Sequence, residues 1–148
     1  MADTIERRTL SLQGAQRVVE AAIGEAVHAG LHVSVAVLGS SGQLKAFAAM
    51  HGASILSTET ARKKALTVIK VGKGTQEFAS DLKKEMAEEP ELFHGMLAMD
   101  GITAIGGGVP IQVGGHMVGA VAVSGASSAE DEEIAHKAAA VLEGKTAG

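Results

Sequence analysis

The sequence lacks several residue types on which common active sites depend. It contains no Cys, no Trp and no Tyr, and its only aromatic residues besides His are three Phe. Without Cys, disulfide bonds, thiolate nucleophiles, Cys-ligated zinc and iron–sulfur clusters are all excluded. Without Tyr, no phenol can act as a general acid or as a metal ligand. The chemistry of any site must therefore come from the remaining side chains, His first among them, or from the backbone.

Charge and hydropathy exclude further classes of protein. The net charge of −4 lacks the basic excess that is typical of nucleic-acid-binding domains. No stretch approaches the roughly 18 apolar residues of a membrane span. The N-terminal segment from Met1 to Arg8 is polar and has no apolar run like that of a signal peptide. We therefore expect a cytoplasmic protein that binds neither nucleic acid nor membrane.

The length and the apolar composition predict one domain over residues 1–148, with flexible ends at 1–9 and 144–148. Hydrophobic residues make up 46% of the chain, so with so few aromatics the core must consist of Ala, Val, Ile, Leu and Met. Small side chains give thin layers, which a neighbouring subunit often completes. We therefore expect a homo-oligomer.

The pattern of apolar residues predicts an α/β (α+β) fold, in which an antiparallel five-stranded sheet is flanked by helices. Helices are expected at about 12–29, 55–71 and 75–86, the last ending before Pro90, and again after Ser127. Strands are expected at 32–38, 43–50, 102–105, 109–113 and 116–123.

Several turns and helix ends have local signatures. Gly114-Gly115 suits a two-residue hairpin turn, and it is the clearest local signal in the chain. Ser11 and Thr75 are expected to cap helices. Ser127 and Glu130 have the spacing of a capping box.

Three segments resemble the GlcG/HbpS-like family of haem-binding proteins, which includes the C-terminal domain of PduO-type corrinoid adenosyltransferases. They are Ala49-Met50-His51-Gly52-Ala53, the run from Ala61 to Thr67, and Gly106 to Ile111 with Val118 to Gly125 and Asp131. Together they span about residues 15 to 140. The resemblance implies a profilin-like sheet flanked by helices, assembly into homo-oligomers, and haem as the cofactor.

The chain departs from the pattern of this family at three places. Gly39-Ser40-Ser41-Gly42 replaces the usual Asp-x-x-Gly, and Ala49 and His51 replace an Arg and an Asp. The segment from Ala122 to Ala126 replaces Gly-Val-Ser-Gly-Gly. These changes alter the expected rim of the pocket, so the ligand could differ from the usual one.

His51 and Lys64 are the first candidate site residues. His51 could bind haem iron or act as a general acid or base, and the alternative is an exposed loop His. Lys64 matches the motif Lys of the family. It could pair with a haem propionate or a substrate carboxylate, or act as a base. Its alternative is structural: a salt bridge to Asp131 or bonds to loop carbonyls.

The remaining candidates are weaker. The amides of Gly106, Gly107 and Gly108 could hold an anion or an oxyanion, and tight packing between subunits would explain the glycines equally well. His28 is a further possible axial ligand, or simply an exposed residue. No metal-ligand spacing such as His-x-x-x-His occurs, so a zinc site is not expected. The cations Arg62, Lys63 and Lys70 are expected on a solvated helix face.

Three functions are compatible with these residues. The first is small-ligand binding, with haem held through a His ligand, His51 or His28, and with Lys64 beside a propionate. The second is a catabolic enzyme of isomerase, lyase or hydrolase type that acts on a carboxylate or carbonyl compound through His51 and Lys64. The third is a non-catalytic oligomeric accessory protein. The first two require the His51 loop, Lys64 and the three glycines to meet at one cavity.

Overall fold

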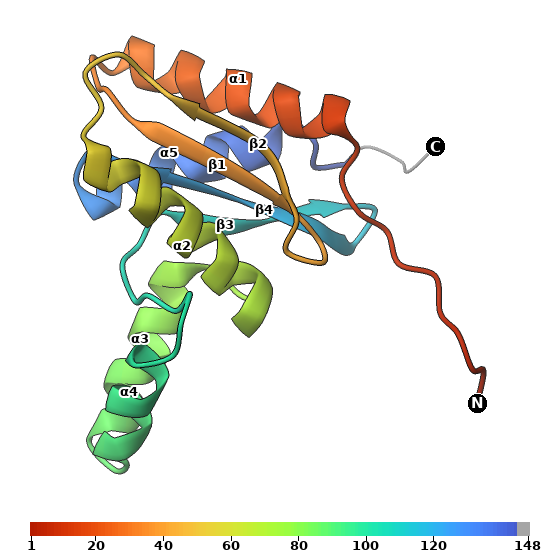
Figure 1. The fold of residues 1–148 in the computed structure, drawn as a ribbon, viewed down its shortest axis with the longest axis vertical. Coiled ribbons are helices and arrows are strands. Elements are labelled where there is room, and N and C mark those ends of the chain that lie inside the picture. Colours follow the sequence, from red (N-terminus) through yellow and green to blue (C-terminus); the bar gives the residue numbers. More distant parts are fainter. Residues whose placement is uncertain (145–148) are drawn as a thin grey trace.

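The fold is built on one antiparallel sheet of four strands. The computed structural model describes residues 1–144, and within them the strands lie in the order β2-β1-β4-β3 (Figure 1). Their bounds are β1 Ser34–Gly39, β2 Leu44–Ala49, β3 Gly108–Val113 and β4 His116–Ser124. Each neighbouring pair is antiparallel, and Ser34 of β1 lies opposite both Ala49 and Ser124.

Helices cover both faces of this sheet. Helix α2 (Ile55–Val71) packs on one face, while α1 (Leu12–His28) and α5 (Ser128–Ala140) pack on the other. Helices α3 (Thr75–Met86) and α4 (Pro90–Leu97) form a hairpin that projects away from the sheet (Figure 1). The α+β class predicted from the sequence is confirmed.

The central strands β1 and β4 are buried on both faces, which explains their nearly continuous apolar sequence. Because side chains alternate along a strand, Val35 and Val37 of β1 pack toward α1 and α5, whereas Ala36 and Leu38 pack toward α2. The α2 side also carries two alanines from β4 and two from α2 itself. These small side chains allow α2 to lie close to the sheet.

The expected local signatures are present. The side chain of Ser11 accepts a hydrogen bond from the amide of Gly14. Gly114 and Gly115 both have positive φ angles, of 57° and 79°, as a primed hairpin turn requires. The capping box of Ser127 and Glu130 forms completely.

The fifth strand, expected at 102–105, does not form, and this expectation was wrong. The backbone of this segment bonds to α2 instead of to a neighbouring strand. The Thr67 hydroxyl accepts from the amide of Thr103 at 2.9 Å and donates to the carbonyl of Gly101 at 3.0 Å. Lys70 Nζ donates to the carbonyl of Asp100 at 2.6 Å. Side chains of one helix thus hold the segment as a loop.

Two further expectations on helix ends need correction. Pro90 does not terminate a helix but occupies the first turn of α4, where its missing amide costs nothing. Thr75 does not cap α3 through its side chain. Its hydroxyl accepts from the amide of Gly108 at 3.0 Å and thereby joins the start of α3 to β3.

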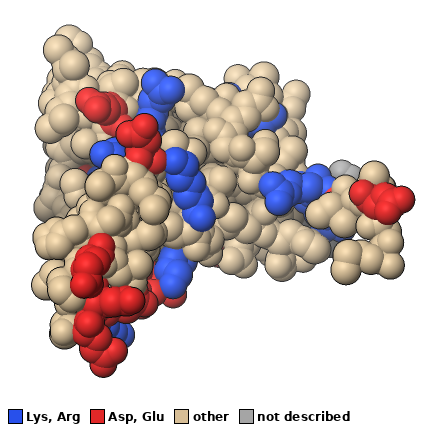
Figure 2. Space-filling view, turned by 60° about the horizontal axis from the view of Figure 1, so that its bottom comes forward, with Lys and Arg blue, Asp and Glu red and all other residues tan. Residues whose placement is uncertain are grey.

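The N-terminal segment is exposed from Met1 to Thr9 and extends away from the body, as Figures 1 and 2 show. The segment is joined to the sheet where the Leu10 amide donates to the carbonyl of Val118. The flexible C-terminal end expected at 144–148 lies outside the described residues except for Gly144. Among the helices of residues 1–144, none combines the length and apolarity that crossing a bilayer requires.

Candidate functional site

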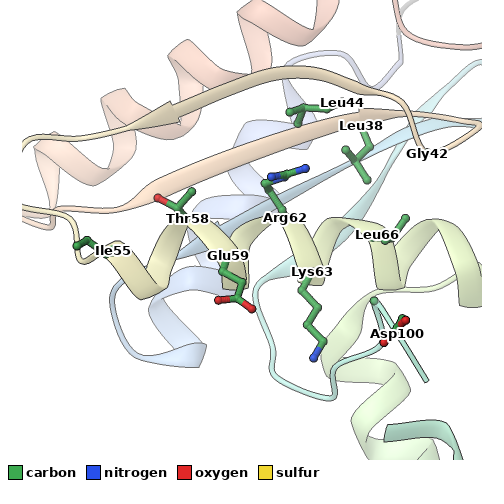
Figure 3. Close-up of a pocket in the computed structure, with 11 residues that line it drawn as sticks. Leu38, Gly42, Leu44, Ile55, Thr58, Glu59, Arg62, Lys63, Leu66 and Asp100 are labelled. Carbon is green, nitrogen blue, oxygen red and sulfur yellow. The ribbon is translucent and has the colours of Figure 1, made fainter. Parts of the chain in front are cut away.

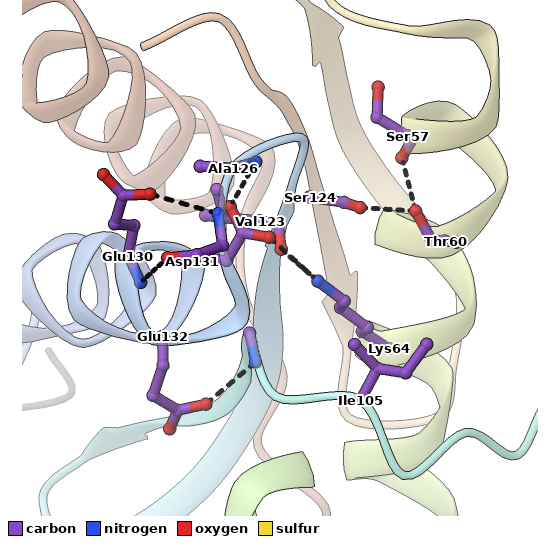
Figure 4. A network of polar contacts seen from close by, with 12 residues as sticks. Ser57, Thr60, Lys64, Ile105, Val123, Ser124, Ala126, Glu130, Asp131 and Glu132 are labelled. Atoms are coloured by element: carbon purple, nitrogen blue, oxygen red, sulfur yellow. Dashed lines mark hydrogen bonds and ion pairs between the residues drawn. The ribbon is translucent and has the colours of Figure 1, made fainter. Parts of the chain in front are cut away.

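Lys64 lies at the centre of a buried polar network between α2, β4 and α5 (Figure 4). Its ammonium donates to the carbonyl of Val123 at 2.9 Å and to Asp131 Oδ2 at 3.2 Å, and both charged side chains are nearly inaccessible. Asp131 also accepts from the amide of Ala126 through its other oxygen. The geometry confirms the structural alternative given for Lys64, the salt bridge to Asp131 together with a bond to a carbonyl.

Burial lowers the pKa of Lys64 below its ordinary value of 10.5, although Asp131 and Glu132 act in the opposite direction. The desolvation of the ammonium therefore outweighs the attraction of the nearby carboxylates. A lysine in this environment is a structural cross-link, because both observed acceptors come from the protein itself.

The triple glycine turn packs directly against Lys64. Gly107 has a φ of 129°, and a Cβ there would lie 2.6 Å from the carbonyl oxygen of Val123 and 2.7 Å from Lys64 Nζ. At Gly108, a Cβ would lie 2.9 Å from the carbonyl oxygen of Lys64. The glycines are therefore required for close packing within the subunit.

Two of the three amides of this turn already have partners within the protein, which argues against the oxyanion hole given as one alternative for them. The Gly107 amide donates to Glu132 Oε1 at 2.9 Å, and the Gly108 amide donates to the hydroxyl of Thr75 at 3.0 Å. An external anion would have to displace a buried partner from either amide. Only Gly106 has no such bond among the described residues.

A row of hydroxyl groups continues the network along α2. Ser34 and Ser57 share a hydrogen bond of 2.7 Å, and Thr60 pairs with Ser124 one turn further along the helix. Ser34 and Ser57 are buried. These contacts join the first turns of α2 to the start of β1 and the end of β4.

The structure does not bring His51, Lys64 and the triple glycine together at one cavity of the single chain. His51 lies exposed in the turn between β2 and α2, whereas Lys64 and Gly107 are packed against each other in the interior. None of the four hollows described for residues 1–144 is lined by any of these three. His28 is exposed at the last turn of α1.

One of these hollows is a groove between α2 and the β1–β2 hairpin, with a volume of about 740 Å³ (Figure 3). This size lies within the roughly 300–1,000 Å³ of typical ligand pockets. Its lining combines aliphatic side chains, two cations, two acids and small residues, namely Leu38, Gly42, Leu44, Ile55, Thr58, Glu59, Arg62, Lys63, Leu66, Asp100 and Gly101. We call it the hairpin groove.

Two cations border the hairpin groove. Figure 3 shows Arg62 extending from α2 toward the strands, and Lys63 extending in the opposite direction, toward the loop that carries Asp100. From sequence these residues were expected only on a solvated helix face. Both side chains are exposed, as predicted. Because the β1–β2 hairpin lies beside the same part of α2, they also line the hairpin groove. No local pattern in the sequence signals this.

Comparison with known proteins places the chain in a family. Residues 10–140 match the family model described as haem degrading protein HbpS-like. A double mutant of HbpS from Streptomyces reticuli has 31% sequence identity and a TM-score of 0.81, with 96% of this chain and 92% of that chain covered. A comparison with curated protein sequences found no significant match.

Two other solved structures share the fold. A complex of PduOC with haem has 26% identity and a TM-score of 0.76, with 90% of this chain and 95% of that chain covered. The Klebsiella pneumoniae protein ORFY has 24% identity and a TM-score of 0.84, with 96% of each chain covered, and this likeness concerns the fold alone. Because the family model matches nearly the whole chain, the protein belongs to the HbpS-like family.

Proposed function

We propose that this protein binds haem in the hairpin groove. The observation that carries the proposal is the combination, in one groove of about 740 Å³, of an aliphatic wall with two cationic side chains. A relative with 26% identity has been solved as a haem complex, and the family model is described by haem degradation. These likenesses support haem as the ligand, and the groove supplies a place for it.

The groove matches the two chemical parts of haem. The macrocycle is flat and apolar, and four aliphatic side chains, Leu38, Leu44, Ile55 and Leu66, would exclude water from it. The propionates are anions, and a guanidinium such as that of Arg62 can hold a carboxylate with two parallel hydrogen bonds. In this proposal Arg62 and Lys63 pair with the propionates, the role expected for Lys64 from the sequence. Lys64 itself forms a buried salt bridge with Asp131.

His51 is the proposed iron ligand. It does not itself line the groove in the single chain, but it lies in the turn that leads to Ile55, which does, and its side chain is exposed and so accessible to a ligand. The neutral imidazole is a common axial ligand of haem iron. His28 belongs to α1, on the opposite face of the sheet from α2, so it has no place in the same site.

Titration of the purified protein with haemin, followed by the Soret band, tests this proposal. The absence of Trp and Tyr leaves the protein with little ultraviolet absorption of its own, so a bound chromophore is conspicuous. We expect saturable binding, and Arg62→Glu should weaken it about tenfold, or about 1.4 kcal/mol. Arg17→Glu is the matched control, because Arg17 is exposed on α1 and makes the same change of charge.

The ligand role of His51 has its own readout. His51→Ala should alter the position of the Soret band as well as the affinity, whereas His94→Ala, which removes an exposed histidine of α4, should alter neither. A broad, unsaturable spectrum for the wild type would refute haem binding. A saturable spectrum that is unaffected by Arg62→Glu would refute the groove as its site.

Self-association remains a prediction of the same proposal. Ile55 and Leu56, at the start of α2, are 93% and 67% exposed, which is unusual for adjacent aliphatic residues unless another surface covers them. A second copy covering them would also close the end of the groove. Light scattering after size exclusion should therefore show an oligomer, and Leu56→Glu should shift it toward the monomer. The cytoplasmic location likewise stays a prediction.

A further inference from the structure

A second hollow lies between α3, β3 and α5, away from the hairpin groove. Its volume is about 890 Å³, and its lining includes Gln76, Ser80, Lys84, Gln112, Glu132 and His136. His136 also lines an adjoining hollow of about 510 Å³ beside the β3–β4 turn. The imidazole thus lies on the boundary of two depressions, where a ligand in either one can reach it.

Glu132 and His136 form an ordered pair in this hollow. Glu132 Oε2 lies 2.9 Å from His136 Nε2, and Oε1 accepts from the buried amide of Gly107 at 2.9 Å. The side chain of Glu132 is only 10% exposed, whereas that of His136 is 66% exposed. The backbone therefore fixes the carboxylate, and the carboxylate fixes an imidazole that solvent and ligands can reach.

This arrangement determines which nitrogen of His136 is available. With Nε2–H donating to the carboxylate, the neutral ring has its lone pair on Nδ1. No hydrogen bond to Nδ1 occurs within residues 1–144. A carboxylate that orients an imidazole in this way is the pairing that positions a general base in hydrolytic sites.

The lining of this hollow carries charges of both signs. Besides Glu132 it includes the carboxylates of Glu77 and Asp81 and the ammonium groups of Lys73 and Lys84. Of the two lysines that line the hollow, Lys73 pairs with Asp81 at 2.6 Å, and Lys84 has no ion pair among the described residues. Lys84 is therefore the cation that remains available to an anionic group of a ligand.

We propose that His136, positioned by Glu132, is the general base of a hydrolytic site for a small ester that carries a negative charge. His136 Nδ1 takes a proton from a water molecule as the water oxygen bonds to the acyl carbon. The ester C–O bond then breaks, and the imidazolium returns the proton to the departing oxygen. Water and ester thus give an acid and an alcohol, with no other reactant. Lys84 binds the negative charge of the substrate.

Two chromogenic esters test this proposal on the full chain without haem, so its result is independent of the proposed haem groove. The neutral probe is p-nitrophenyl acetate and the anionic probe is mono-p-nitrophenyl succinate, and both release coloured p-nitrophenolate. We expect the wild type to cleave both esters faster than six equivalents of free imidazole. His136→Gln should lower the rate at least tenfold, and His94→Gln, the matched control on α4, should leave it unchanged.

Glu132 and Lys84 have separate readouts. Glu132→Gln keeps an acceptor for the Gly107 amide, and should lower kcat severalfold with little change in KM. Lys84→Ala should raise KM for the succinate ester only. The proposal is overturned if the wild type is no faster than free imidazole, or if His136→Gln and His94→Gln lose the same small fraction of the rate.

Discussion

Lys64 Nζ lies 3.2 Å from Asp131 Oδ2 beneath the triple glycine turn, and this contact joins α2 to α5 across the end of the sheet. The two helices lie on opposite faces, so the pair connects the two layers that enclose β4. Because both side chains are almost inaccessible, each compensates a charge that would otherwise be isolated in the interior.

Removing one member of this pair should destabilise the protein strongly. Lys64→Met leaves the carboxylate of Asp131 buried without its cation, and we expect a loss of about 3–5 kcal/mol in the free energy of unfolding. The double variant Lys64→Met with Asp131→Asn should recover a large part of this loss, because no buried charge remains. Urea denaturation followed by circular dichroism measures both. A double variant as unstable as the single one would contradict the account.

The same lysine should make stability depend on pH in the alkaline range. Since burial lowers the pKa of Lys64 in the folded state, the unfolded chain binds the proton of Lys64 more readily. Between the lowered folded pKa and the ordinary 10.5, the contribution of Lys64 to the free energy of unfolding therefore rises with pH. Lys64→Met lacks this contribution. The free energy of unfolding of the wild type minus that of the variant should therefore grow toward pH 10.5. If the two free energies change in parallel with pH, the lowered pKa is refuted.

Gly107 should tolerate no side chain. A Cβ there would collide with the carbonyl of Val123 and with Lys64 Nζ, and the φ of 129° is itself unfavourable for other residues. Gly107→Ala should therefore cost more than the roughly 1–3 kcal/mol of backbone strain alone. Gly24→Ala is the control, because Gly24 lies inside α1 with open space around it. It should stabilise the protein by about 0.5–1 kcal/mol. The melting temperatures of the two variants distinguish these effects. Equal shifts for Gly107→Ala and Gly24→Ala would contradict the packing argument.

The capping box at the start of α5 should contribute measurably to stability. The Ser127 hydroxyl accepts from the amide of Glu130, and Ser127→Ala removes this bond at a cost of about 0.5–2 kcal/mol. The hydrogen bonds from Ser127 lower the pKa of Glu130, so the contribution of Glu130 is present above its unfolded pKa and is lost as pH falls. When the melting temperature is measured at successively lower pH, it should fall less for Ser127→Ala than for the wild type.

The amino-acid sequence by itself determined the local structure and the family. The cap at Ser11, the glycine pair of the β3–β4 turn and the capping box of Ser127 depend on neighbours within a few residues, so the pattern was sufficient. The buried strands β1 and β4 could also be predicted from the sequence, because a strand covered on both faces is apolar throughout.

Only the tertiary structure decided what the polar residues do. Hydrogen bonds with the Thr67 hydroxyl hold the segment expected as a fifth strand as a loop. Thr67 accepts from the amide of Thr103, which is 36 residues away in sequence, so no local pattern reveals that contact. Lys64 and Lys63 are adjacent in sequence, yet one is buried in an ion pair and the other lines a groove. Successive helical residues point about 100° apart, so which partner each meets depends on the elements that pack against α2, and these come from distant parts of the chain.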